Sequence, residues 1–237
     1  MINFDREVTT VDTGTIREEY RPRIAIVDYR AGNLRSVSRA LQAAGADAFV
    51  TEARDEIAAA DAVVLPGVGA ARSAMRELEQ RRLIEPVQDA VRSGRPFLGV
   101  CLGLQVLMTR SEEDGGVDCL GIIPGTVVRL RGDLKIPHMG WNQVRQRARH
   151  RLFQGIPDLA DFYFVHSFVV IPDDPSIIVG DTDYGGSFAS ALGYRNVLAT
   201  QFHPEKSADA GLLIYRNFTR WVANTASVAA GAVVDHV

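Results

Sequence analysis

The sequence predicts an α/β domain in which a mostly parallel sheet is flanked by helices and followed by a second half rich in strands. Two observations predict this fold class. Continuous apolar runs in the first half, as buried parallel strands require, alternate with stretches of helical periodicity. After about residue 119, short strand-like runs recur with few helical periods between them. Alternating strands and helices favour parallel pairing with helices on both faces of the sheet.

The first half contains four expected strands and the helices that connect them. The strands are expected at residues 24–27, 49–50, 62–65 and 97–100. A helix is predicted from Asn33, where apolar residues recur at helical spacing, to Gly45, a typical residue after a helix end. A longer helical region covers residues 71–92, and Pro86 is expected to break it into two helices.

The second half is expected to add strands and to close with one helix. The expected strands cover residues 126–130, 162–170, 177–182, 187–193 and 197–202, and the helix covers 207–222. We expect one domain over residues 23–223. Residues 1–22 form a polar appendage and residues 224–237 a C-terminal tail, and we expect both to be poorly ordered.

Composition excludes several classes of protein. The 237 residues carry 26 Lys and Arg against 29 Asp and Glu, a net charge of −3, so nothing suggests binding to nucleic acid or to a membrane surface. No apolar run is long enough to span a membrane. The two cysteines, Cys101 and Cys119, cannot build a disulfide framework, which favours a cytoplasmic location.

The segment around Cys101 has the strongest chemical signal. A buried strand leads into Gly99-Val100-Cys101-Leu102-Gly103, and a helical pattern follows. This is the turn between strand and helix on which hydrolases expose a nucleophile, here with cysteine in place of serine. Glycines allow the tight turn, and the helix N-terminus favours a thiolate and a developing oxyanion. The alternative is a small buried thiol packed under a helix.

A cysteine nucleophile needs a base, and the base needs a group that orients it. His203 ends an apolar run and is followed by Pro204 and Glu205. Residues i and i+2 of an extended segment point to the same side, so Glu205 can accept from one imidazole nitrogen while the other faces the thiol. The alternative is a surface turn at the end of a strand.

A glycine-flanked turn, Pro66-Gly67-Val68-Gly69, follows another buried strand. Ligands of open α/β sheets bind at this edge, and such a turn can offer backbone N–H groups to an oxyanion. An ordinary loop between strand and helix is the alternative.

Together, the cysteine turn and the His203-Pro204-Glu205 segment resemble the class I (triad) glutamine amidotransferases, which implies a flavodoxin-like arrangement of the sheet. Further segments resemble the glutaminase subunits of imidazole glycerol phosphate synthases, enzymes of histidine biosynthesis. They are Asp28-Tyr29 with Gly32-Asn33-Leu34, the Pro66–Gly69 turn, residues 136–142, residues 163–167 and residues 202–207. The resemblance runs from about Ile24 to about Trp221, and Pro137–Asn142 is its most diagnostic part.

The resemblance implies hydrolysis of L-glutamine to glutamate and ammonia. Cys101 would attack the side-chain amide and form a γ-glutamyl thioester, His203 would move the proton, and Glu205 would orient His203. Backbone N–H groups of Val68, Gly69 and Leu102 would form the oxyanion hole. This chemistry requires no metal and no organic cofactor.

The resemblance also implies a set of residues that hold the substrate. Gln105 and Glu113 match substrate-binding positions, with Glu113 facing the α-ammonium group. Main-chain groups around Ser167 and Phe168 would meet the α-amino and carboxylate groups. For Glu113, a solvated acidic run over residues 112–114 is an equally open alternative.

The implied partner is a separate cyclase subunit, with which the chain would form a heterodimer and to which the ammonia would pass. The matching interface positions are Asn33, Trp141, Asn142, Tyr163 and Lys206. Tyr163 could instead be a core strand residue, and Lys206 a solvated charge. Arg30 departs from the family, which often has glycine there.

Three alternatives to this assignment remain open at this point. The chain could be a glutaminase serving another synthase, although residues 137–142 argue against that. It could be a cysteine peptidase or deglycase of a related fold, or a binding module without catalysis.

Overall fold

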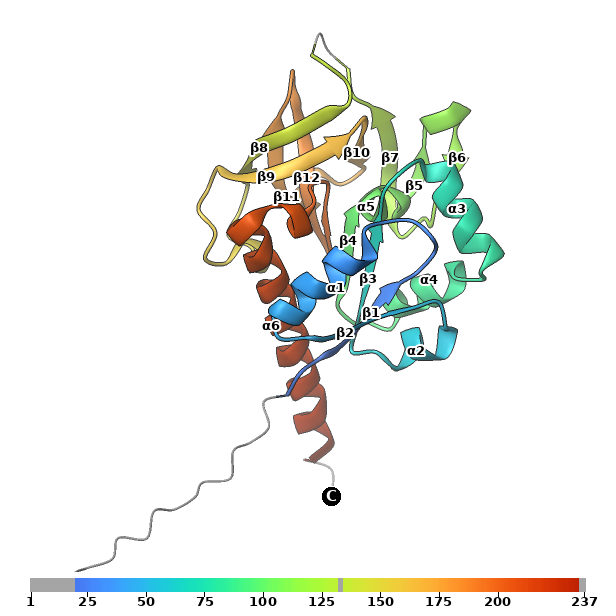
Figure 1. Cartoon of the computed structure of the whole chain (residues 1–237), viewed down its shortest axis with the longest axis vertical. Helices are drawn as coiled ribbons and strands as arrows, with labels where there is room; N and C mark the ends of the chain where they lie inside the picture. The colour runs from blue at the N-terminus through green and yellow to red at the C-terminus, as the bar shows by residue number, and fades with distance from the viewer. Residues whose placement is uncertain (1–19, 132–133, 235–237) are drawn as a thin grey trace, which may run out of the picture.

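The computed structural model describes residues 20–131 and 134–234, which fold around one extended mixed sheet (Figure 1). Its parallel part has the order β2-β1-β3-β4-β13. These strands are β1 (Arg23–Val27), β2 (Asp47–Thr51), β3 (Ala62–Gly67), β4 (Phe97–Cys101) and β13 (Val197–Thr200). The carboxyl ends of β3 and β4 therefore meet at one edge, which is where ligands of such sheets bind.

The sheet continues from β13 through the strands of the second half. In order, they are β12 (Ser187–Tyr194), β10 (Phe168–Pro172), β7 (Ile123–Arg129), β5 (Met108–Ser111) and β6 (Val117–Asp118). A branch leaves β12 through β11 (Ile178–Asp183) to β8 (His138–Gln146) and β9 (Ala160–His166). The predicted β-rich second half is thus present, and its hairpin of β8 and β9 extends away from the parallel sheet.

Helices cover both faces of the parallel strands. They are α1 (Leu34–Ala43), α2 (Arg54–Ala59), α3 (Ala71–Gln80), α4 (Ile84–Arg92), α5 (Leu102–Val106) and α6 (Ala208–Val234). Short 3₁₀ turns are η1 (Glu113–Gly115), η2 (Arg151–Phe153), η3 (Pro175–Ile177) and η4 (Pro204–Lys206). None of the described helices is both long and apolar enough to cross a membrane.

Alternate side chains of the central strands enter two different cores. In β3, Val64 joins the core that includes Leu41 and Phe218, whereas Val63 and Leu65 join the core on the opposite face. Burial on both faces is the reason that these strands are continuously apolar in sequence. Each fully buried aliphatic side chain contributes about 1.5–3 kcal/mol, so this central region anchors the turns that follow β3 and β4.

Several predicted boundaries were wrong. The helical region 71–92 breaks at residues 81–83, not at Pro86, because Pro86 lies in the first turn of α4, where its missing N–H has no intrahelical partner to lose. The run 162–170 divides at Ser167 into β9 and β10, which pair with different strands. The last helix does not end at 222; α6 continues to Val234, through most of the segment expected to be a tail.

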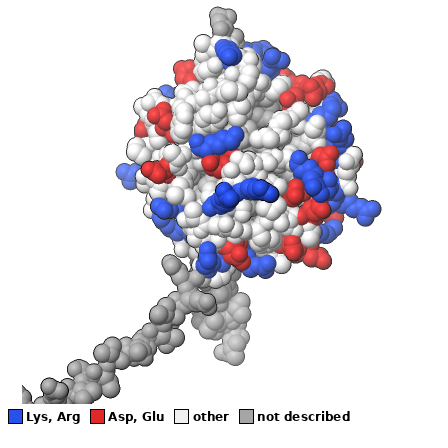
Figure 2. Space-filling model, viewed as in Figure 1, with Lys and Arg blue, Asp and Glu red and all other residues white. Residues whose placement is uncertain are grey.

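Parts of both expected terminal segments lie outside the described residues. Residues 1–19 of the expected appendage, and residues 235–237, are outside the part that the structure describes. Acidic and basic side chains are interspersed over the visible face, in keeping with the small net charge (Figure 2).

Candidate active site

Cys101 lies in the tight turn between β4 and α5. Its backbone has φ 55° and ψ −107°, a conformation that costs a non-glycine residue of order 1–3 kcal/mol and is common for residues in active sites. The neighbouring Gly99 and Gly103 are required because there is no space for a side chain at either position. A Cβ on Gly103 would lie 1.8 Å from the carbonyl oxygen of Leu65, and a Cβ on Gly99 would lie 2.8 Å from Leu107 Cδ1. The close packing of α5 on β3 and β4 therefore holds the cysteine at the sheet edge.

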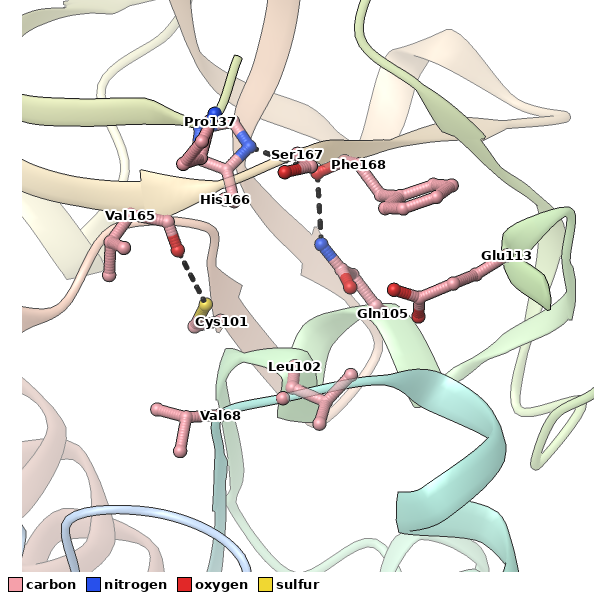
Figure 3. A pocket seen from close by; sticks show the side chains of 11 residues that line it. Val68, Cys101, Leu102, Gln105, Glu113, Pro137, Val165, His166, Ser167 and Phe168 are labelled. Atoms are coloured by element: carbon pink, nitrogen blue, oxygen red, sulfur yellow. Dashed lines mark hydrogen bonds between the residues drawn. The ribbon is translucent and has the colours of Figure 1, made fainter.

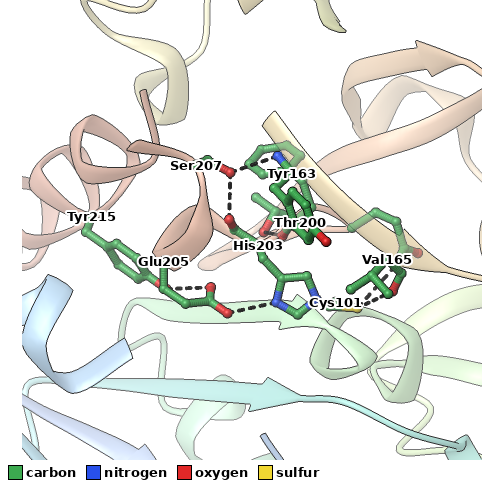
Figure 4. A network of polar contacts seen from close by, with 10 residues as sticks. Cys101, Tyr163, Val165, Thr200, His203, Glu205, Ser207 and Tyr215 are labelled. Atoms are coloured by element: carbon green, nitrogen blue, oxygen red, sulfur yellow. Dashed lines mark hydrogen bonds and ion pairs between the residues drawn. The ribbon is translucent and has the colours of Figure 1, made fainter. Parts of the chain in front are cut away.

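The imidazole of His203 reaches this edge because β13 runs parallel to β4, with Thr200 opposite Val100. The His203 backbone is fixed by three hydrogen bonds. Its N–H donates to the Tyr163 carbonyl at 2.9 Å, and its carbonyl accepts from Ser207 Oγ at 2.6 Å and from the Lys206 N–H at 3.0 Å. Figure 4 shows the ring between Glu205 on one side and Cys101 on the other.

Glu205 and His203 form a buried pair. Nδ1 of His203 and Oε1 of Glu205 are 2.8 Å apart, and only 2% of each side chain is exposed. The second carboxylate oxygen accepts from the Tyr215 hydroxyl at 3.5 Å. Because Nδ1 is committed to the carboxylate, the other ring nitrogen is the one available to the thiol.

Nε2 of His203 faces the Cys101 sulfur, and it has no other polar partner among the described residues (Figure 4). Burial alone lowers the pKa of His203. Interactions with the Cys101 and Glu205 side chains outweigh burial and raise this pKa to about 10. An imidazole with raised proton affinity is suited to take a proton from the thiol and hold it as an imidazolium.

Two groups that the sequence did not assign also contact the thiol. Gln201 Nε2 donates to the sulfur at 3.6 Å, and the sulfur lies 3.9 Å from the Val165 carbonyl oxygen. Gln201 is fully buried and lies two residues before His203. In the sequence, only its amide side chain within the largely apolar run 197–202 could have drawn attention to it.

A cavity of about 230 Å³ opens beside Cys101 (Figure 3). Eight of the predicted catalytic, oxyanion and substrate-binding residues line it: Val68, Gly69, Cys101, Leu102, Gln105, Glu113, Ser167 and Phe168. Pro137, Val165 and His166 complete the lining and had no assigned role.

The two predicted substrate-binding side chains are already held by the protein. Gln105 Nε2 donates to the Phe168 carbonyl at 2.9 Å and to Gln201 Oε1 at 3.1 Å. Glu113 accepts from the backbone N–H of Ala71 at 2.6 Å, at the N-terminus of α3. Partial burial raises the pKa of Glu113, and that hydrogen bond offsets only part of the rise. Its carboxylate lines the cavity rather than lying in a solvated run.

The glycine-flanked turn after β3 lies against the cysteine turn, since Gly67 is opposite Cys101 in the pairing of β3 and β4. Val68 is 43% exposed and Gly69 has φ 100°. Behind the turn, a Cβ on Gly67 would lie 2.1 Å from the hydroxyl of Tyr29, which is completely buried and has no hydrogen-bond partner among the described groups.

The predicted interface residues lie mainly on β8, β9 and η4. Trp141 on β8 is 55% exposed and meets Tyr163 of β9 edge-on, with ring centroids 6.1 Å apart. The Lys206 ammonium lies 5.7 Å from the Tyr163 ring centroid. Asn33 is exposed just before α1, a helix that contacts η4. Asn142 differs: it is half-buried and donates to the Asp183 carbonyl at 2.9 Å.

Arg30 also has a structural consequence. It adopts φ 64°, the left-handed conformation that glycine takes most easily, and its N–H donates to Asp28 Oδ1 at 2.9 Å. This conformation explains why glycine suits the position.

Fold and site together define a class of protein. The glutamine amidotransferase class-I family matches residues 25–220. In this chain, Cys101 meets the buried His203–Glu205 pair at the edge of the sheet. A solved glutamine amidotransferase superposes with a TM-score of 0.64 at 18% identity, covering 84% of this chain and 98% of that one. PurLQS from Thermotoga maritima gives 0.64 at 16% identity, covering 86% and 100%. These two structures are similar in fold, and the predicted α/β class is confirmed.

Sequence relatives narrow the assignment within that class. The imidazole glycerol phosphate synthase subunit HisH of Nitrosococcus oceani is 52% identical over 203 residues, which cover 84% of this chain and 97% of that protein. The HisH subunit of Dehalococcoides mccartyi is 49% identical over 195 residues, covering 82% and 95%. The chain therefore belongs to the HisH family of class I glutamine amidotransferases, as the sequence motifs predicted.

Proposed function

We propose that residues 23–223 form a glutaminase domain that hydrolyses L-glutamine and passes the ammonia to a cyclase subunit of imidazole glycerol phosphate synthase. The cyclase would combine the ammonia with a phosphoribulosyl intermediate of histidine biosynthesis, giving imidazole glycerol phosphate and aminoimidazole carboxamide ribotide. The observation that carries the proposal is the meeting of Cys101 with the buried His203–Glu205 pair at the wall of a small cavity.

The first chemical step is acylation of the cysteine. His203 takes the thiol proton, and the sulfur attacks the side-chain amide carbon of glutamine. As the tetrahedral intermediate collapses, its C–N bond breaks and His203 returns the proton to the departing ammonia. Glu205 keeps Nδ1 of His203 protonated and stabilises the imidazolium. Water then attacks the γ-glutamyl thioester, with His203 accepting its proton. As the C–S bond breaks, His203 returns the proton to the Cys101 sulfur and glutamate leaves.

The oxyanion of both tetrahedral intermediates needs donors at the sheet edge. The N–H of Leu102 belongs to the first turn of α5, where helix N–H groups have no intrahelical partner. Val68 or Gly69 would supply the second donor from the turn after β3. That turn is exposed and glycine-flanked, so the partner subunit can adjust its orientation.

The face proposed for the cyclase carries Trp141, Tyr163 and Lys206. An exposed tryptophan packed against a tyrosine, with a cation over the tyrosine ring, offers the aromatic and charged groups that dominate binding energy at protein interfaces. Asn33 lies just before α1, which contacts η4. Asn142 follows Trp141 on β8, but its side chain points to the opposite face of the hairpin, where it donates to the Asp183 carbonyl. The face proposed for the cyclase is close to the catalytic pair, because the Tyr163 carbonyl accepts the backbone N–H of His203.

Glutamate release in the presence of a cyclase subunit tests the proposal. The chain is mixed with a histidine-pathway cyclase, with and without its phosphoribulosyl substrate, and glutamate is measured. We expect weak activity alone and strong stimulation in the complete mixture. If an authentic cyclase gives no stimulation while glutaminase activity is present, the chain serves a different synthase.

A pair of cysteine variants tests the nucleophile. Cys101→Ala should abolish glutamine turnover while leaving cyclase binding intact. Cys119→Ala is the matched control, because burial raises the pKa of the Cys119 thiol to about 11 and nothing around it activates it. Turnover near wild type in Cys101→Ala would remove that sulfur from the mechanism.

A further inference from the structure

Two buried histidines outside the triad form a pair within the hairpin of β8 and β9, and one of them, His166, lines the substrate cavity. His138 of β8 and His166 of β9 are opposite each other in the antiparallel pairing, and only 2% and 6% of them are exposed. Nδ1 of His138 lies 3.0 Å from Nε2 of His166. His138 is stacked between the rings of Phe164 and Tyr184, with centroids 4.8 and 4.0 Å away.

The partners at the two ends of this pair fix the position of every proton. Nδ1 of His166 lies 2.9 Å from the carbonyl oxygen of Phe168, which can only accept, so Nδ1 carries a proton. Nε2 of a neutral His166 must then accept, and the proton between the rings belongs to Nδ1 of His138. Nε2 of His138 therefore accepts in turn, from the Asn142 side-chain amide at 3.2 Å. The hydrogen bonds run in one direction, from Asn142 to the Phe168 carbonyl.

The acceptor at the end of this chain belongs to the substrate cavity. The Phe168 carbonyl also accepts from Gln105 Nε2 at 2.9 Å, and Gln105 lines the cavity beside Cys101. The same amide nitrogen reaches Gln201, whose own amide nitrogen donates to the Cys101 sulfur at 3.6 Å. The orientation of two side-chain amides around the thiol thus depends on where the Phe168 carbonyl points.

We propose that His138 and His166 are positioning residues: two neutral imidazoles, each protonated on Nδ1, that hold the Phe168 carbonyl and through it the Gln105 side chain at the cavity wall. Their kinetic role rests on the proposed glutaminase function, whereas their protonation does not. Neither imidazole touches the reacting atoms.

Burial supports the neutral state of both rings. Desolvation lowers the pKa of His138 to about 4. For His166, desolvation is again the main cause, the neighbouring His138 and His203 lower the pKa further, and the hydrogen bond to Phe168 opposes them; the result is about 3. Both rings should stay uncharged throughout the physiological range.

Nitrogen-15 NMR of histidine-labelled full-length chain tests the protonation pattern without turnover. We expect His138 and His166 to be neutral Nδ1–H tautomers at pH 7. His150 is the internal control, because its Nδ1 accepts from the Leu152 N–H at 3.3 Å, which requires the opposite, Nε2–H tautomer. An Nε2–H tautomer or a charged ring at His138 or His166 would overturn the proposal.

Kinetics of variants at His138, measured with the cyclase and its substrate, test the positioning role. His138→Phe keeps a ring in the aromatic stack but removes the donor to His166. We expect the KM for glutamine to rise about tenfold with kcat within about twofold, since ground-state binding and not chemistry is disturbed. His138→Asn keeps a side-chain N–H near the place of Nδ1 and should restore the KM to within about threefold of wild type.

A control variant at His150 shows whether any change in KM is specific to the His138–His166 pair. His150→Asn, at a half-buried histidine outside this chain of hydrogen bonds, should leave the KM unchanged. An unchanged KM in His138→Phe, or equal losses in His138→Phe and His138→Asn, would reduce the pair to a structural role and refute the proposal. A wild-type chain with no glutaminase activity would refute the proposed function instead, while the tautomers would still be read by NMR.

Discussion

Replacement of Glu205 by glutamine isolates the contribution of one buried charge. The change keeps the size of the side chain and an oxygen that can accept from His203 Nδ1, but it removes the negative charge 2.8 Å from the imidazole. Since both side chains are only 2% exposed, solvent screens this interaction little. Burial, which lowers the pKa of His203, remains in the variant.

The size of the effect follows from that geometry. Loss of one partner of a buried pair costs about 3–5 kcal/mol, and each 1.4 kcal/mol corresponds to about tenfold in rate, so glutamine turnover should fall by about 10²- to about 4 × 10³-fold. The pKa of His203 should fall below its raised value, because the contribution of Glu205 is lost while that of Cys101 remains. A group with a raised pKa stabilises the fold fully below its unfolded value of 6.5, and this contribution is lost as the pH rises through the raised value. The decline in stability at alkaline pH should therefore be smaller in the variant.

Two assays measure these effects in the same protein. Glutamate release with the cyclase and its substrate gives the rate, and NMR titration of the His203 ring from pH 5 to pH 11 gives its protonation. Glu205→Asp, which keeps the charge at a greater distance, is the matched control and should retain more activity. Turnover of Glu205→Gln within threefold of wild type, with the pKa of His203 unchanged, would refute the assigned role of Glu205.

Three further predictions concern stability and assembly. Gly103→Ala should lower the free energy of unfolding in urea by about 2 kcal/mol or more, because the new Cβ would lie 1.8 Å from the Leu65 carbonyl; a loss under about 0.5 kcal/mol would contradict that packing. Although burial raises the pKa of Asp181, hydrogen bonds from two arginines lower it overall, so stability should fall as the pH drops through that lowered pKa, and Asp181→Asn should flatten this decline in acid unfolding curves. Lys206→Ala should weaken cyclase binding in calorimetry more at low salt than at high salt; a salt-independent affinity loss would exclude a charge interaction there.

The catalytic motifs were predictable from the sequence because each lies on a local pattern. Cys101 is flanked by glycines after an apolar run, and His203 and Glu205 are two residues apart in one segment. Their meeting depends on the adjacent, parallel placement of β4 and β13, which the strand pattern alone did not determine. The family resemblance implied that the three residues act together but did not place the strands.

Other features depend on tertiary contacts and had weak local signals. Pro86 was read as a helix break, although proline is tolerated in a first helical turn, and the real break at 81–83 carries no proline. Strand β8 is interrupted by polar residues because one face of the hairpin is exposed, so its periodicity was missed. Gln201 and His166 were not assigned roles, because a buried amide or imidazole reveals its function only through the partners that the fold brings to it.

The most direct test is to look for the covalent bond between glutamine and the chain. The complex of the chain with the cyclase and its substrate is mixed with glutamine, quenched in acid during turnover, digested, and analysed by mass spectrometry. A γ-glutamyl group on the peptide that contains Cys101, absent from the peptide that contains Cys119 and absent in His203→Ala, is the predicted result. Steady glutamate release with both cysteines unmodified at every quench time, and undiminished in Cys101→Ala, would contradict the account.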